Sequence, residues 1–418
     1  MNRSLFSRFW FLSIPLLVGA VVAVTWANYR YAGQNPGGND FLVHWVGTRA
    51  LLVDGKTPYG DEVAVQIQTL AYGRPARPGE HELRVAYPLY SVVVFLPYAL
   101  ISDYTLARAL WMTTLEIALV LLAIFSLRLT RWKLGIGFLT FYLLFALLWY
   151  HSLRPLINGN AVILIALWIG MAFLALRSER DELAGILLAF TTIKPHVVLP
   201  ILIFVVIWTL SQRRWAALFW MAATVGMLSV ILGFFVPDWP VQNLREILRY
   251  SSYNPSGTPA AIFADWAPAA GRWIGWAFSA LVLLVMVVEW FLARRKEFSW
   301  FLWTACLTLV ASQLSGIQAD PGNFIILFLP LVLIITALEE RWGRAGRVMN
   351  CFLMLLLFVG PWALFLNTLT LGDQPLQHPV LLFPLPLFLL ITLYWVRWWA
   401  VHPQRFLIDA LRESEALE

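Results

Sequence analysis

The run "YTLARALWMTTLEIALVLLAIFSL" (104–127) decides the fold class, because its residues are almost all apolar over the length of a membrane span. A helix rises about 1.5 Å per residue, so this run can cross the roughly 30 Å hydrocarbon core of a bilayer. The whole chain has the same character: of its 418 residues, 60% are hydrophobic and 13% charged, and the mean hydropathy is +0.72. These values exclude a soluble globular enzyme and indicate an all-α polytopic membrane protein.

Similar apolar runs recur along the chain and predict about twelve membrane spans. They lie at 10–28, 104–127, 134–151, 161–176, 183–194, 196–210, 215–235, 272–293, 299–316, 323–338, 347–370 and 380–399. A further apolar stretch, 88–101, is short for a span and is interrupted by Pro97. We expect this stretch to form a re-entrant or interfacial helix. We also expect 183–210 to be two short helices broken at Lys194-Pro195.

Basic residues cluster at the ends of these runs and predict the orientation of the chain. The clusters are Arg3/Arg8, Arg128/Arg131/Lys133, Arg177/Arg180, Arg213/Arg214, Arg294/Arg295/Lys296, Arg341/Arg344/Arg347 and Arg397/Arg405/Arg412. If 88–101 does not cross, every cluster falls in the cytoplasm, as the positive-inside rule requires. The first run is then a retained signal anchor, and both termini are cytoplasmic. The chain forms one membrane domain, 1–418, with two long outer loops at 29–103 and 236–271.

Charge and cysteine content exclude other classes of partner. The net charge of +6 indicates orientation and attraction to anionic lipid rather than nucleic-acid binding. The two cysteines, Cys306 and Cys351, lie in apolar runs and show neither a disulfide framework nor metal-ligand spacing. No nucleotide-binding or metalloprotease motif is present, so no cofactor is predicted, and an energy-rich donor would have to arrive from the membrane.

The stretch "GGNDFLVHWVGTRALLV" (37–53) reads as a helix start in the first outer loop. Asn39 or Asp40 can cap this helix by accepting hydrogen bonds from its free N–H groups. Asp40, His44 and Thr48 then share one stripe, because residues four apart lie on the same helix face. Two interpretations remain open: a cap with a polar helix face, or a general base, Asp40, aimed at an incoming hydroxyl.

Further polar residues fall in predicted outer loops. "DGKTPYG" (54–60) is a turn that carries Tyr59, and "VAYPLY" (85–90) starts the 88–101 helix at Tyr87-Pro88, where a helix N-terminus can bind an anion. "HSLRPLINGN" (151–160) is expected to join two spans, "TIKPHVV" (192–198) places ionisable side chains between two apolar helices, and "SGIQADPGN" (315–323) is a late outer loop. These loops and the second long loop supply Arg154, Asn158, Asn160, Lys194, His196, Asp265, Gln318 and Asp320 as candidates.

Simpler roles compete for three of these charged residues. Arg154 either pairs with a phosphate or extends to lipid headgroups, and Asp320 either serves a site or only shapes a turn. Glu116, in the middle of the 104–127 run, either faces a cavity or pairs with a neighbouring helix.

The order of these motifs resembles the GT-C membrane glycosyltransferases, and within them glycosyltransferase family 87, the polyprenol-phosphate-mannose-dependent α-mannosyltransferases. The resemblance rests on "NDFLVHWVGTRALLVDGKTPY", "YPLYSVVVFLPYALIS", "ARALW", "LINGNAVILIAL" and "RDELAGILLAFTTIKPHVVLPILI", which follow one another in residues 1–216. The family usually has Tyr-Pro-Pro where this chain has Tyr87-Pro88-Leu89.

The resemblance implies a GT-C fold and a mechanism. Asp40 would accept the proton of an acceptor hydroxyl that attacks the anomeric carbon of a polyprenyl-phosphate sugar, with inversion. His44 and Tyr59 would orient the base or the acceptor. Lys194, Arg154, His196 and Tyr87 would bind the leaving phosphate, without a metal.

The resemblance also implies a lipid or glycan acceptor, contact with membrane lipids, mannose as the sugar, and a bacterial plasma membrane with the site facing the exterior. Two other functions remain compatible with the residues. One is a lipid or solute transporter or flippase, although such proteins tend to show matching halves that this chain lacks. The other is a non-catalytic membrane assembly factor, for which Asp40 would be dispensable.

Overall fold

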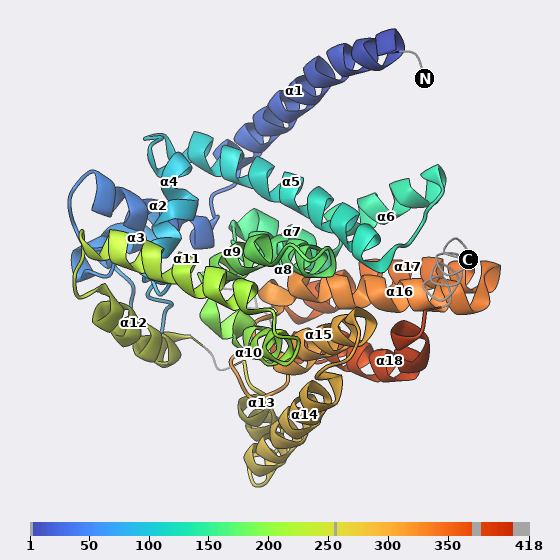
Figure 1. The fold of residues 1–418 in the computed structure, drawn as a ribbon. Coiled ribbons are helices and arrows are strands. Elements are labelled where there is room, and N and C mark those ends of the chain that lie inside the picture. Colours follow the sequence, from blue (N-terminus) through green and yellow to red (C-terminus); the bar gives the residue numbers. More distant parts are fainter. Residues whose placement is uncertain (1–2, 255–256, 370–377, 404–418) are drawn as a thin grey trace. The chain divides into compact units, whose positions relative to one another are not determined.

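The computed structural model describes residues 3–254, 257–369 and 378–403, and its regular secondary structure within these ranges is entirely helical (Figure 1). Helical segments overlap each of the twelve predicted runs, but the predicted number of spans is only partly supported. Among the described residues, six helices are long and apolar enough to span a membrane, and a seventh span is possible if the bent pair Ile136–Leu148 and Tyr150–Asn158 counts as one. The same residues include four shorter apolar helices of 10–17 residues: Leu89–Ala99, Val162–Arg177, Pro195–Ser211 and Phe298–Ser312. The chain is therefore a multi-pass membrane protein. The C-terminal tail 404–418, with Arg405 and Arg412, lies outside the described residues.

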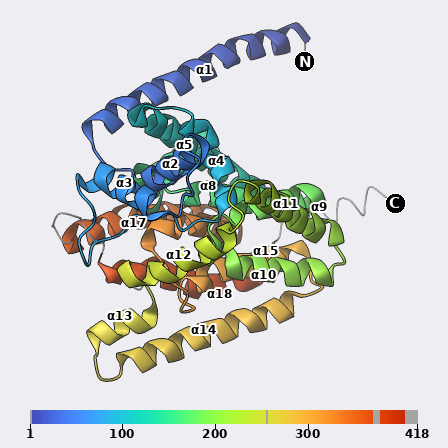
Figure 2. The same ribbon diagram turned by 90° about the vertical axis from the view of Figure 1, so that its left-hand side faces the viewer.

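The chain divides into two compact units, the first comprising Met1–Ala118, Pro155–Ala161 and Leu232–Tyr253. Its helices are α1 (Arg3–Gln34), α2 (Asn39–Leu52), α3 (Asp61–Tyr72), η1 (Leu89–Ser91), α4 (Val92–Ala99), the first half of α5 (Tyr104–Thr130) and α12 (Trp239–Tyr253). The helix α1 is long and projects away from α2, α3 and α4 (Figures 1 and 2).

The 88–101 stretch is a short helix, as predicted, but it starts later than expected. Pro88 is the N-cap residue of η1 rather than a residue of its first turn. Proline has no backbone N–H, and a helix start needs none at this position. The helix η1 continues directly into α4.

The second unit comprises Leu119–Arg154, Val162–Ile231 and Asn254–Glu418. Its helices are the second half of α5, α6 (Ile136–Leu148), the first part of α7 (Tyr150–Asn158), α8 (Val162–Arg177), α9 (Asp181–Thr191), α10 (Pro195–Ser211), most of α11 (Trp215–Gly233), α13 (Pro259–Trp266), α14 (Gly271–Ala293), α15 (Phe298–Ser312), η2 (Pro321–Leu327), α16 (Phe328–Trp342), α17 (Arg344–Thr368), η3 (Pro379–Leu382) and α18 (Pro384–Val401). The break between α9 and α10 at residues 192–194 confirms the predicted pair of short helices.

The prediction of a loop over 151–160 is wrong, because α7 continues to Asn158 after a 46° bend from α6. Pro155 lies inside α7 beyond its first turn, so its missing N–H leaves α7 without one backbone hydrogen bond. The turn comes only at Gly159, whose φ of 72° is in the left-handed region that favours glycine.

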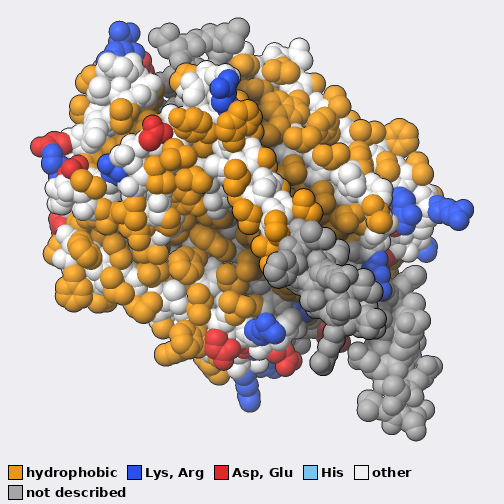
Figure 3. Space-filling view, turned by 90° about the horizontal axis from the view of Figure 1, so that it is seen from above, with side chains coloured by type: hydrophobic (Ala, Val, Ile, Leu, Met, Phe, Trp, Pro, Cys, Tyr) orange, Lys and Arg blue, Asp and Glu red, His pale blue; other side chains and the backbone are white. Residues whose placement is uncertain are grey.

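Burial separates the helices of the second unit into a core and a lipid-facing periphery. The segment Pro321–Trp342 has 89% of its most apolar window buried, whereas Trp215–Gly233 and Arg344–Thr368 each have only 17% buried. The surface seen in Figure 3 is largely hydrophobic, with charged side chains towards its margins. Exposed apolar helix faces of this kind are expected where the solvent is lipid.

Glu116 of α5 pairs with a neighbouring helix. Its Oε2 accepts a hydrogen bond of 2.9 Å from Asn28 Nδ2 on α1, and Asn28 also donates to Thr113 Oγ1 at 3.1 Å. These bonds tie α1 to α5 inside the first unit, so Glu116 has a structural partner.

Candidate active site

Asp40 lies in the first turn of α2, but neither it nor Asn39 caps the helix as predicted. The N-cap residue is Gly38, with φ 77° and no side-chain cap hydrogen bond. A side chain at position 38 could not be accommodated, because a Cβ there would lie 2.6 Å from Arg108 Nε and 3.0 Å from Tyr104 Oη. With the cap formed by backbone alone, Asp40 sits within the helix, where the positive end of the helix dipole favours a carboxylate.

Asp40, His44 and Tyr87 form one cluster. The His44 ring, 7% exposed, lies 4.0 Å from the Tyr87 ring centroid and stacks on Phe95 at 4.5 Å. Burial, and after it the negative charge of Asp40, raises the pKa of the Tyr87 hydroxyl well above its usual range. The phenol therefore stays protonated and can donate a hydrogen bond beside a carboxylate that can accept a proton.

Tyr59, predicted as an orienting residue, holds the backbone next to this cluster. Its hydroxyl donates a 2.8 Å hydrogen bond to the Tyr87 carbonyl oxygen, and its side chain is buried. Burial raises the pKa of Tyr59. His44, Tyr59 and Tyr87 line one narrow crevice together with Thr48. Two residues of the predicted helix stripe, His44 and Thr48, therefore face the same crevice as both tyrosines, and Asp40 is not among its lining residues.

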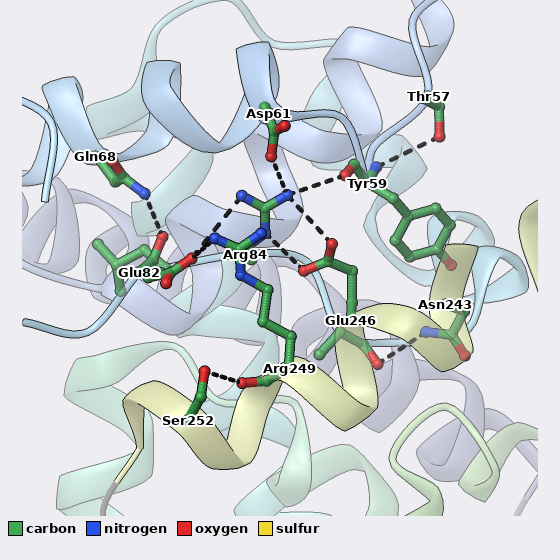
Figure 4. Close-up of polar contacts among 12 residues, drawn as sticks. Thr57, Tyr59, Asp61, Gln68, Glu82, Arg84, Asn243, Glu246, Arg249 and Ser252 are labelled. Atoms are coloured by element: carbon green, nitrogen blue, oxygen red, sulfur yellow. Dashed lines mark hydrogen bonds and ion pairs between the residues drawn. The ribbon is translucent and has the colours of Figure 1, made fainter. Parts of the chain in front are cut away.

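A buried ion pair fixes the segment that carries Tyr87. Arg84 Nε donates to Glu246 Oε2 on α12 at 2.6 Å, and the two side chains are only 7% and 4% exposed. Arg84 also contacts Asp61 at 2.6 Å, and this hydrogen bond lowers the pKa of Asp61 (Figure 4). Asn243 of α12 donates to the Ala86 carbonyl at 3.0 Å. Sequence reasoning missed this network, because its two charged partners are 162 positions apart.

The helix α5 supports α2 from a second side. The Tyr104 hydroxyl donates to the carbonyls of Gly37 and Gly38, each at 3.1 Å, and Arg108 Nη1 donates to the Asn35 carbonyl at 2.7 Å. These bonds hold the turn that leads into Asp40.

A third residue of α5, Trp111, ties α2 to the end of α7. Its ring stacks on Phe41 at 5.5 Å, and its Nε1 donates to the Gly159 carbonyl at 2.8 Å. A Cβ on Gly159 would lie 2.5 Å from Phe41 Cβ, so only glycine permits this approach. The motifs "ARALW" and "LINGN" thus meet at the helix of Asp40. Of the predicted residues in that segment, Asn160 is buried and Asn158 is half-buried.

Lys194 of the second unit forms a cluster of its own. It is the N-cap residue of α10 and is 7% exposed, and its Nζ donates to Asn323 Oδ1 at 2.7 Å. Asp320, three residues before Asn323, accepts a 2.8 Å hydrogen bond from Gly322 N and caps η2, so turn formation accounts for this contact. Asn323 was not predicted, and its place at the end of "DPGN" was the available signal.

The other predicted residues of this unit have separate positions. The guanidinium carbon (Cζ) of Arg154 lies 5.3 Å from the ring centroid of Phe365, which is a cation–π contact. His196 and Asp265 are exposed, and Gln318 is half-buried. Within the described ranges, no group of three or more His, Cys, Asp or Glu side chains is arranged to hold a metal ion.

A comparison with protein-family models adds to this geometry. The model of glycosyltransferase family 87 matches residues 86–312, more than half of the chain. The chain belongs to glycosyltransferase family 87. This family is one of the GT-C membrane glycosyltransferases, as the sequence motifs predicted. Searches of curated proteins and of solved structures found no match.

The family match covers some candidate residues and not others. Those inside it are Tyr87, Arg154, Asn158, Asn160, Lys194, His196 and Asp265, and those outside it are Asp40, His44, Tyr59, Gln318 and Asp320. Asp40 is therefore assigned from the local geometry and the preceding motif, not from the matched region.

Proposed function

We propose that this family 87 glycosyltransferase moves a hexose, with mannose as the expected sugar, from a polyprenyl-phosphate carrier to a lipid or glycan acceptor. The observation that carries the proposal is the placement of Asp40 in the first turn of α2, one helical turn before His44, whose ring contacts that of Tyr87. A carboxylate held on a helix next to a hydrogen-bond donor suits a general base.

In the proposed reaction, the acceptor hydroxyl oxygen attacks the anomeric carbon of the donor while the bond from that carbon to the phosphate oxygen breaks. The acceptor proton passes to the Asp40 carboxylate, and the polyprenyl phosphate leaves from the opposite face, so the configuration inverts. His44 and Tyr87 orient the base and the acceptor, and Tyr59 holds Tyr87 through its backbone carbonyl.

The leaving phosphate needs positive charge placed beforehand. We assign this role to Lys194 and Arg154, with His196 and Tyr87, on the strength of the family motifs and the burial of Lys194. The Lys194 ammonium is held at the start of α10 by its hydrogen bond to Asn323, and a positioned ammonium can bind a phosphate as a point charge. Further candidates for sugar contacts are Asn158, Asn160, Asp265, Gln318 and Asp320.

The orientation follows from the basic clusters. We propose one membrane domain with about twelve spans, both termini in the cytoplasm and the loops 29–103 and 236–271 on the outer face, where the reaction takes place. The family resemblance suggests a bacterial plasma membrane.

The test is sugar transfer in liposomes with radiolabelled polyprenyl-phosphate hexoses and a lipid extract of the host. Asp40→Asn removes the base, and we expect transfer to fall to background. Glu62→Gln is the control, because Glu62 is an exposed acid of the same loop, paired with Lys56. Equal transfer by wild type and a folded Asp40→Asn variant would reject Asp40 as the base. Donor movement across the bilayer without transfer would support a transporter instead.

A further inference from the structure

A second cavity lies on the face of α2 opposite Asp40. Its volume is about 650 Å³, and α2 lines it with residues that recur every three or four positions, including Asn39, Val46, Arg49 and Val53. His44 and Thr48 belong to the other side of the helix and line the active-site crevice. The two spaces are separated by α2 itself, about 10 Å across.

The cavity carries two guanidinium groups, from Arg49 and Arg108, against one acid, Asp54. Neither arginine contacts a carboxylate in the part of the chain that the structure describes. Arg49 Nη1 donates to the carbonyls of Ala99 and Ile101 at 2.7 and 3.3 Å, which leaves Nη2 and Nε for a ligand.

Arg108 adds a second positive charge beside the cavity, although its Nε packs against Gly38 and its Nη1 and Nη2 donate to the Asn35 and Ile157 carbonyls. The side chain is 2% exposed, and its Nε is buried with no hydrogen-bond partner. A buried donor without an acceptor costs free energy, more so when the group is charged. An anion in the cavity would offset the charge of this arginine and of Arg49 together.

The walls of the cavity indicate what kind of anion it binds. The cavity is lined by the rings of Trp45 and Tyr104, by Ala32 near the end of α1, and by Pro36 in the turn that follows. Upstream of this point α1 exposes apolar side chains such as Trp26, 64% exposed, which suit contact with acyl chains. A phosphate at Arg49 with chains running along α1 matches this arrangement of charge and apolar surface.

We propose that this cavity binds the phosphate headgroup of a resident anionic bilayer phospholipid. The ligand is distinct from donor and acceptor, because their reacting atoms must meet Asp40 on the other face of α2. This distinction rests on the proposed function of Asp40, whereas the test measures lipid binding alone and does not depend on sugar transfer.

The experiment is native mass spectrometry of the delipidated, detergent-solubilised full chain, titrated with phosphatidylglycerol or with zwitterionic phosphatidylcholine. We expect the wild type to bind one phosphatidylglycerol more tightly than phosphatidylcholine. Arg49→Gln should weaken phosphatidylglycerol binding about tenfold, the loss expected for one charge-assisted contact. Arg245→Gln, at an exposed arginine of α12 that does not line the cavity, is the matched control and should bind as wild type does.

A second variant keeps the test valid if Arg49→Gln does not fold. Val53 is 63% exposed at the cavity lining, so Val53→Glu adds a negative charge without disturbing the core, and it should also weaken binding. Equal binding of the two lipids by wild type, or unchanged phosphatidylglycerol binding by both variants, would overturn the proposal and leave Arg49 as a cap for α4. Displacement of phosphatidylglycerol by polyprenyl phosphate through Arg49 would assign the cavity to the donor and overturn it as well.

Discussion

Replacing Glu246 by Gln tests whether the buried ion pair between α12 and Arg84 holds the active-site segment in place. Arg84 and Glu246 are 7% and 4% exposed, and removing one partner of a buried pair costs about 3–5 kcal/mol. Arg84 keeps its contact with Asp61, whose side chain is 82% exposed and therefore screened by water. We expect a cost near the lower limit, about 3 kcal/mol, which corresponds to a more than hundredfold rise in local opening.

Hydrogen exchange measured by mass spectrometry reads this opening directly. Amides of α12 should exchange more than a hundredfold faster in Glu246→Gln than in wild type. Glu62→Gln is the matched control: its pair with Lys56 has a similar distance of 2.7 Å, but the side chains of Glu62 and Lys56 are 79% and 55% exposed. Water screens an exposed pair and reduces its contribution to stability, so exchange in α3 should change far less than exchange in α12. If hydrogen exchange rose only slightly in both variants, the conclusion that burial makes the Arg84–Glu246 pair stabilising would be refuted.

Three further predictions concern other supports of the fold. Gly159→Ala forces a Cβ into Phe41 at a φ of 72°, so we expect about 2–4 kcal/mol of destabilisation in thermal unfolding and a loss of sugar transfer greater than tenfold. Asn323→Leu removes the acceptor of Lys194 Nζ and should lower the free energy of unfolding by about 2 kcal/mol, whereas Asn323→Asp, which keeps an acceptor, should not; equal effects of both would reject the contact. The pKa of Glu80 is lowered to about 2 by its hydrogen bonds to neighbouring arginines, so its stabilising effect is present above pH 4.5 and is lost as the pH falls through about 2. Glu80→Gln should therefore speed proteolysis of the 73–83 loop at pH 7 by thermolysin but not at pH 2 by pepsin.

Most of the secondary structure could be predicted from the sequence. Helices overlap all twelve apolar runs, the 88–101 stretch is a short helix, and the break before Pro195 occurs where expected. These features depend on local properties, namely hydropathy over one span and the missing N–H of proline. The α2 helix, with Asp40 and His44 one turn apart, was predicted from another local property, the pattern of a helix start.

The errors arose where distant residues decide a local structure. The cap of α2 is Gly38 rather than Asn39 or Asp40, because Arg108 and Tyr104 of α5 occupy the space beside it. The helix α7 extends through residues that have the composition of a loop. Hydropathy and capping preferences contain no information about these neighbours.

The sequence by itself determined that this is a multi-pass membrane protein with a family 87 glycosyltransferase region and with an acid and a histidine on one helix. Only the tertiary structure decided what surrounds that helix: Tyr87 beside Asp40, the buried pair of Arg84 and Glu246, and a second cavity behind α2. The physical reason is that apolar length and helical period are repeated along the chain, whereas a single buried contact between distant residues leaves no periodic signal.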